Sequence, residues 1–246
     1  MEKTIISLPK LYVIGDSISI HYGPYLQAYL KGSMDYSRKE AREETLLKLD
    51  NPQGDSGGDS SMVLSFLKGK QRHGGIDADV LLLNCGLHDI KSDPVSGKIQ
   101  VPLDQYENNL REIVKIVRNF GSEIIWVRTT LFDDSIHNSA GVGFYRYAAD
   151  CVEYNRVADR VMQENRIPAI DLCTFTLNLG NDLHCDHVHF TEIVRKKQAA
   201  YIASALKERF GYSGMCLTQY FVSFVKYLKS IFKAHKSFSA FWGLRR

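Results

Sequence analysis

Three short polar stretches of this sequence hold residue types that can perform acyl-transfer chemistry. The first, Gly15-Asp16-Ser17, follows the apolar run 11–14, which places a serine hydroxyl at the end of an expected buried strand. A serine in that place can act as a nucleophile, and backbone N–H groups at a helix start can stabilise an oxyanion. An Asp-Ser pair is also a good helix cap. The tripeptide alone therefore leaves capping and catalysis open.

The second stretch is Asp186-His187-Val188-His189, just before a helix that Thr191 could cap. On a turn, a spacing of three brings the Asp186 carboxylate within reach of one ring nitrogen of His189. The other nitrogen is then available to take a proton from a hydroxyl. The tetrapeptide thus contains a candidate base and the group that orients it.

The same region is crowded enough to suggest two alternatives, a metal site and a polar surface loop. His184, Cys185, Asp186, His187 and His189 lie within six positions. A metal site needs ligands that converge from more than one element, and the outside candidates at this sheet edge are His88 and His21. Our prediction contains no metal and no cofactor.

The third stretch, Gly86-Leu87-His88-Asp89, follows the apolar run Val80 to Leu83 and Asn84. A donor side chain here would face the same crevice as Ser17. Read alone, the stretch is a strand-ending turn. It supports a catalytic site only together with the other two stretches, because all three are expected at one edge of the same sheet.

The elements that must position these residues alternate between strand and helix. Short apolar runs at 11–14, 80–83, 124–127 and 167–172 are typical of buried parallel strands. Helical patterns lie between and after them, at 25–30, 62–67, 103–120, 144–165 and 191–210, with Gly121 and Gly211 as helix stops.

This alternation predicts an α/β fold, a three-layer α/β/α sandwich with a mostly parallel, flavodoxin-like sheet. The segments 32–60 and 130–143 are predicted as long loops, which in compact domains often bind ligands. In such a sheet the site lies beyond the carboxyl ends of the strands.

In their order and spacing the motifs resemble those of the SGNH hydrolase superfamily, the GDSL-type esterases, over roughly residues 10 to 210. By this resemblance Ser17 is the nucleophile and its own N–H is an oxyanion donor. Ser56-Gly57-Gly58-Asp59-Ser60 is similar to the second block, with Gly58 N–H as a further donor. Residues 86–89 resemble the third block, and Asp186 with His189 matches the last.

One residue departs from the family pattern, because His88 stands where the family's third block has an asparagine that donates to the oxyanion. A neutral histidine can donate through one ring N–H, so the role is retained in principle. Asn84 is a second candidate donor, or a strand-end cap.

The resemblance implies a carboxylic ester hydrolase that works through an acyl-serine intermediate. By analogy with small bacterial members, we expect a short acyl group, acetyl above all, on a carbohydrate or a similar polar substrate. The alternatives are an O-acyltransferase to a sugar hydroxyl, a catalytically weak carbohydrate-binding protein and, from the histidine cluster, a metal-dependent hydrolase. Substrate-binding residues are not assigned, although six side chains could form aromatic and cationic walls: Tyr22, Tyr25, Arg38, Arg128, Tyr145 and Arg146.

Charge separates the chain into two predicted parts, a catalytic domain at 1–211 and a basic amphipathic extension at 212–246. Residues 1–211 hold 25 basic and 28 acidic side chains, whereas the extension holds six Lys or Arg and no acidic residue. Such a domain gives no basic face for nucleic acid, which is therefore not an expected partner. Apolar residues at helical spacing from Leu217 to Phe232 predict a helix that packs on its own domain, on a second copy or on an anionic membrane.

Cysteine usage indicates a reducing compartment. The five cysteines are widely spaced and form no CxxC pair. The N-terminus has no apolar signal-peptide core before its first expected strand. We therefore expect a cytoplasmic protein. A peripheral membrane contact through residues 212–246 is the alternative.

Overall fold

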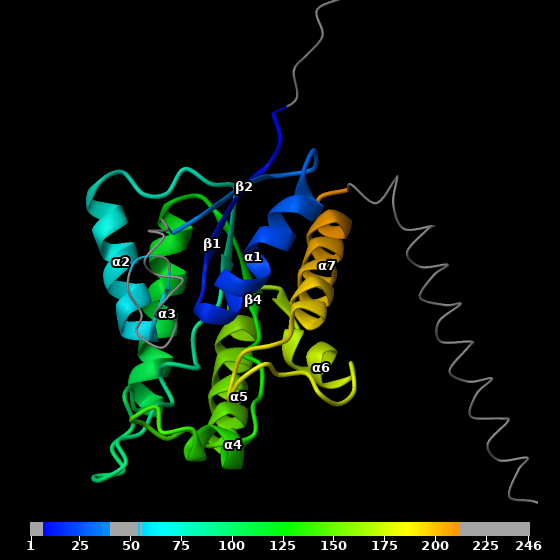
Figure 1. Ribbon diagram of the computed structural model, residues 1–246. Coiled ribbons are helices and arrows are strands. Elements are labelled where there is room, and N and C mark those ends of the chain that lie inside the picture. Colours follow the sequence, from blue (N-terminus) through cyan, green and yellow to red (C-terminus); the bar gives the residue numbers. More distant parts are fainter. Residues whose placement is uncertain (1–6, 40–53, 55, 212–246) are drawn as a thin grey trace, which may run out of the picture. The chain divides into compact units, whose positions relative to one another are not determined.

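The computed structural model describes residues 7–39, 54 and 56–211 (Figure 1). By its internal contacts the chain divides into two units, Met1–Ala205 and Leu206–Arg246. The predicted extension at 212–246 lies outside the described residues, so its helix and its contacts stay predictions. Within the described part of the chain, no helix is long and apolar enough to cross a membrane.

The centre of the fold is a five-stranded sheet in the order β2-β1-β3-β4-β5, and every neighbouring pair is parallel. This is the flavodoxin-like strand order, in which ligands bind where the order reverses, here between β1 and β3. The predicted α/β class is therefore confirmed. The strands are β1 (Lys10–Ile14), β2 (Asp35–Arg38), β3 (Val80–Leu83), β4 (Glu123–Val127) and β5 (Ala169–Ile170).

Helices follow the strands along the chain and cover the sheet. The long ones are α1 (Ser17–Leu30), α2 (Ser60–Arg72), α3 (Leu103–Asn119), α5 (Ala148–Glu164) and α7 (Glu192–Arg209), and the short ones are α4 (Asp134–Ser139) and α6 (Leu172–Leu177).

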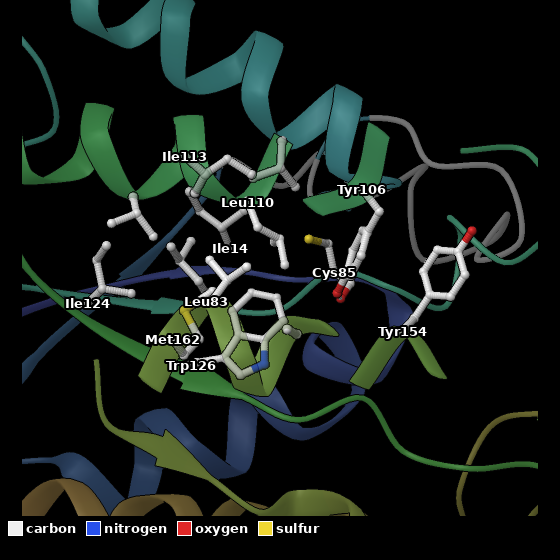
Figure 2. Packing of buried hydrophobic residues seen from close by; sticks show 14 of the residues in the cluster. Ile14, Leu83, Cys85, Tyr106, Leu110, Ile113, Ile124, Trp126, Tyr154 and Met162 are labelled. Carbon is white, nitrogen blue, oxygen red and sulfur yellow. The ribbon is translucent and has the colours of Figure 1, made fainter. Parts of the chain in front are cut away.

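Successive side chains along each strand point to opposite faces of the sheet. Ile14, Leu83 and Trp126 align across β1, β3 and β4, and all three belong to the core cluster formed with α2, α3 and α5. Figure 2 shows Leu110 and Ile113 of α3 above these strand residues. Buried parallel strands can be apolar on both faces, which explains the continuous run VLLL in β3.

The opposite face is covered by other helices. Figure 1 shows α1 beside residues 192–205 of α7, on the side of the sheet away from α2 and α3. Leu11, Val13 and Leu82 alternate with the residues of the first face and are also buried. The sheet is thus sandwiched between two helical layers.

Four expectations about individual elements are wrong. The predicted loop 32–60 contains β2, an edge strand whose polar sequence DYSR and half-exposed side chains gave no apolar signal. The loop 130–143 contains α4, and the expected strand 167–172 is only the two-residue β5, followed at once by α6. The first helix begins at Ser17 and not at residue 25, because Asp16 caps it directly after the strand.

Candidate active site

The turn after β1 places Ser17 at the first position of α1. Asp16 is the N-cap, and its Oδ1 accepts a hydrogen bond of 3.0 Å from the N–H of Ile18. The capping interpretation is therefore right for Asp16, and it leaves the hydroxyl of Ser17 for another partner. The first N–H groups of a helix have no intrahelical acceptor and carry positive partial charge, so the Ser17 N–H is suited to a developing oxyanion.

The partner of the Ser17 hydroxyl is His189, which lies in the loop before α7. Nε2 of His189 lies 2.9 Å from Oγ of Ser17, and Nδ1 lies 2.7 Å from Oδ2 of Asp186. Both contacts expected from the sequence are present. Ser17 and His189 are only 6% and 3% exposed, so little water competes for their hydrogen bond.

Asp186 is held as a carboxylate by its own loop. Partial burial acts to raise its pKa, but the N–H groups of His189 and Val188 and the His189 ring donate to it and lower the pKa to about 2. An ionised Asp186 orients the imidazole and stabilises the imidazolium that forms when Ser17 loses its proton.

Direct hydrogen bonds join the second block to the first and third. The N–H of Gly57 donates to the carbonyl of Gly15 over 2.8 Å. The N–H of Ser60 donates to both carboxylate oxygens of Asp89, at 2.9 and 3.1 Å. Motifs far apart in the sequence therefore form one connected site at the carboxyl edge of the sheet.

Gly58, the second oxyanion candidate, lies in the same region, but its N–H is bound within its own block. Its φ of 68° is in the left-handed region that favours glycine. Its N–H donates to Oγ of Ser56 over 3.2 Å. A substrate oxygen would have to share or replace that long hydrogen bond.

His88 is almost fully buried, with 3% exposure, and its electrostatic surroundings keep it neutral. Burial is the main cause of a pKa well below 6.5, and the charges of Lys91 and Arg146 lower it further. Its Nδ1 has no hydrogen-bond partner among the described residues. A neutral ring at this turn keeps one N–H donor, which is what the predicted oxyanion role requires.

The sequence makes Arg146 a candidate substrate wall, but the structure buries it against the third block. It is 1% exposed, and its Nε donates to the carbonyl of Leu87 over 2.7 Å. The guanidinium thereby fixes the turn that carries His88. No sequence signal connects position 146 with position 87, because the contact depends on the tertiary fold.

Asn84 is a structural residue, as the cap interpretation held. Its amide nitrogen donates to the carbonyl of Val127 at 2.8 Å and to Oγ1 of Thr129 at 3.1 Å. It therefore ties the end of β3 to the end of β4 instead of facing a substrate.

Most of the other wall candidates are also engaged within the protein. Tyr22 is 2% exposed, and Arg128 forms ion pairs with Asp159 and Asp171. Of the remainder, Arg38 donates to Ser19, Tyr25 donates to Glu192, and Tyr145 is 37% exposed.

The histidines of the crowded loop turn toward separate neighbours. The ring of His184 stacks on Phe190 with centroids 4.6 Å apart, and Nδ1 of His187 lies 2.7 Å from Nδ1 of His137. Among residues 7–39, 54 and 56–211, no group of three or more His, Cys, Asp or Glu side chains is arranged to hold a metal ion.

Solved structures with a similar fold include esterases and acylhydrolases. A lipase/acylhydrolase from Enterococcus faecalis has a TM-score of 0.62 at 15% identity, over 82% of this chain and 97% of that one. The acetyl xylan esterase AlAXEase has a TM-score of 0.59 at 18% identity, over 80% of this chain and 98% of that one. The psychrotrophic esterase EstA from Pseudoalteromonas sp. has a TM-score of 0.56 at 13% identity, over 82% and 99%.

No protein-family model matches the sequence, and no curated protein matches it. At such low identity the likeness establishes the fold, which is that of the GDSL-type, or SGNH, hydrolases. The resemblance that the four motifs suggested is therefore confirmed at the level of the fold.

Proposed function

We propose that this protein is a serine hydrolase that cleaves a short acyl ester, acetyl above all, from a carbohydrate or a similar polar alcohol. The observation that carries the proposal is the hydrogen-bonded series Ser17–His189–Asp186, placed at the start of α1. An acetyl xylan esterase among the proteins of the same fold supports the choice of acyl group and alcohol.

In the first half of the reaction, Oγ of Ser17 attacks the ester carbonyl carbon while Nε2 of His189 takes the hydroxyl proton. The carbonyl oxygen becomes an oxyanion beside the N–H of Ser17 and a ring N–H of His88. Gly58 joins them if its N–H turns from Ser56 to the substrate. When the tetrahedral intermediate collapses, His189 returns the proton to the departing alcohol oxygen, and the acyl group stays on Ser17.

In the second half, water attacks the acyl-serine carbonyl and gives one proton to His189. Collapse of the second tetrahedral intermediate breaks the bond to Oγ of Ser17, and the proton returns to that oxygen. The products are the free carboxylic acid and the original enzyme. If a sugar hydroxyl replaces water, the same steps produce a transferase, so an acceptor assay separates the two activities.

The experiment is to measure acetate release from a panel of aryl and sugar acetates by the wild type and by Ser17→Ala. The matched control is Ser122→Ala. Ser122 is also 6% exposed, but it lies just before β4, at the amino end of the strand and not at the carboxyl edge of the sheet where Ser17 lies. We expect turnover by the wild type and the control and almost none by Ser17→Ala. Equal turnover by Ser17→Ala would contradict the proposal.

Location and partners are proposed on the same basis. The widely spaced cysteines support a reducing, cytoplasmic location. The small or glycan ester as partner follows from the substrate proposed above. Contact of residues 212–246 with a membrane or a second copy is a prediction for the full-length chain, which vesicle sedimentation and a size measurement would test.

A further inference from the structure

A groove lies beside Asp186, between two segments that are distant in the sequence. One wall comes from residues 131–140, after β4 and through α4, and the other from residues 177–187, before the catalytic loop. Its volume is about 910 Å³, which is in the range of pockets that hold a small ligand. The walls are joined where Nδ1 of His137 lies 2.7 Å from Nδ1 of His187.

The groove begins at the Asp186 end of the series Ser17–His189–Asp186, and neither Ser17 nor His189 lines it. Asp186 lines the groove and is also the partner of His189 Nδ1. In the proposed mechanism His189 protonates the departing alcohol, so the alcohol lies on the histidine side of the scissile bond. The carbonyl oxygen instead points toward the N–H of Ser17 and the turn of His88. An alcohol portion long enough to extend past His189 would reach the groove at Asp186.

The lining of the groove combines apolar surface with negative charge. Ile136 and Leu177 are 56% and 49% exposed, so they present aliphatic surface to an occupant. Asp133 and Asp182 lie in the same lining, together with Asp186. None of the described residues that line the groove is Lys or Arg.

This combination suits an uncharged sugar and disfavours an anionic one. A sugar ring has apolar faces that pack on aliphatic side chains and hydroxyl edges that bond to carboxylates. A uronate or a phosphate would instead face like charges, with no Lys or Arg in the described lining to offset them. We propose, building on the hydrolase function above, that the groove between 131–140 and 177–187 binds the alcohol portion of an extended, uncharged glycoside ester.

The first test compares an extended ester with one too small to fill the groove. The probes are acetylated xylotriose and 4-nitrophenyl acetate, and the quantity is the ratio of their kcat/KM values. Truncating both apolar side chains, in Ile136→Ala/Leu177→Ala, is expected to lower the ratio about tenfold, from two aliphatic contacts of roughly 0.7 kcal/mol each. An unchanged ratio overturns the proposal.

The matched control removes two other exposed apolar side chains that do not line the groove. Val95 and Val152 are 95% and 56% exposed. Val95→Ala/Val152→Ala is expected to keep the wild-type ratio. A fall as large as that of Ile136→Ala/Leu177→Ala would show that the effect does not belong to the groove, and would also overturn the proposal.

The second test addresses charge, with an acetylated trigalacturonate as the anionic probe. Asp182 has a φ of 54°, a conformation that asparagine also tolerates, so Asp182→Asn removes one charge without a new backbone strain. The preference for the neutral over the anionic trisaccharide should fall about two- to fivefold, and more at low salt than at high salt. A preference for the anionic probe in the wild type overturns the assignment of an uncharged alcohol.

The outcomes distinguish this proposal from the hydrolase proposal. If the wild type hydrolyses neither ester, the hydrolase function is wrong, and the groove is then tested by calorimetry with unacetylated xylotriose. Binding that is weakened by Ile136→Ala/Leu177→Ala supports a sugar site in the groove. No binding, or binding that these substitutions leave unchanged, refutes it.

Discussion

The turns that carry Ser17 and His88 occupy equivalent places, at the ends of the neighbouring strands β1 and β3, but different contacts hold them. The first turn has a side-chain cap of its own, because Asp16 accepts a hydrogen bond from an N–H only two residues away, and the N–H of Gly57 adds one distant contact at the carbonyl of Gly15. The side-chain contacts of the second turn reach distant parts of the chain, because Arg146 donates to the carbonyl of Leu87 and Asp89 accepts from the N–H of Ser60. A local motif therefore describes the nucleophile turn well and the oxyanion turn only in part.

The largest expected effect is in the chemistry centred on the first turn. His189→Gln removes the base, and kcat should fall by roughly 10⁴- to 10⁶-fold, since triad residues act as a unit. Steady-state kinetics with a sugar acetate measures the loss. The circular dichroism spectrum serves as the control for folding, and a loss below tenfold in a folded variant would remove His189 from the base role.

Asp89 in the second turn should make the free energy of unfolding depend on pH. Burial raises the pKa of Asp89 from 3.8 to about 7, so the folded state binds this proton more tightly than the unfolded state. The stabilisation is complete below pH 3.8 and is lost as pH rises through about 7, a change of roughly 4 kcal/mol.

The measurement is the free energy of unfolding in urea for the wild type and for Asp89→Asn, from pH 4 to pH 8. Other groups titrate in both proteins, so the difference between the two curves isolates Asp89. The free energy of unfolding of the wild type should therefore decrease relative to that of Asp89→Asn as pH rises. A difference that stays constant with pH would show that Asp89 has an ordinary pKa.

Removal of the His88 side chain should lower kcat but spare substrate binding. His88→Ala is expected to cost roughly 10²- to 10³-fold in kcat, the usual loss for one oxyanion donor, with little change in KM. His88→Asn restores a neutral donor and should retain activity.

The pH profile sharpens this result. The pKa of His88 is well below 6.5 because the ring is buried, so titration of His88 should not set the acid limb of the activity profile. The acid limb should therefore be almost the same in His88→Asn and in the wild type. An inactive His88→Asn enzyme would show that the third block does not supply a donor.

The smallest expected effect concerns the support of the second turn. Arg146→Lys keeps the buried charge but loses the Nε donor to Leu87, so kcat should fall about fivefold, the worth of one hydrogen bond of ~1 kcal/mol. Arg128→Lys is the control, because Arg128 lies at the end of β4 and its guanidinium forms ion pairs with Asp159 and Asp171. Equal losses in both variants would indicate a general effect of arginine removal.

Sequence reasoning succeeded where local pattern and physical cause coincide. The apolar runs of β1, β3 and β4 identified the sheet, because buried parallel strands need no polar alternation. The spacing of Asp186 and His189 fixed their contact, since both lie on one turn. The edge strand β2 was missed because a strand with one neighbour and exposed side chains does not need to be apolar.

The parts that could not be predicted depend on contacts between distant residues. The role of Arg146 follows from a hydrogen bond to a carbonyl 59 positions away. The crowded histidines suggested a metal site, but His187 turns to His137 on α4 and His184 to Phe190. Short-range spacing does not specify such partners.

The most direct test of the hydrolase proposal is to label the nucleophile. The full-length protein is treated with diethyl 4-nitrophenyl phosphate, which phosphorylates an activated serine, and the adduct is located by peptide mass spectrometry. We predict one diethylphosphoryl group, on Ser17, and loss of esterase activity in proportion to labelling, with no labelling of Ser17 in His189→Gln. Esterase activity that survives complete labelling of Ser17, or inactivation with the adduct on another residue, would contradict the proposal.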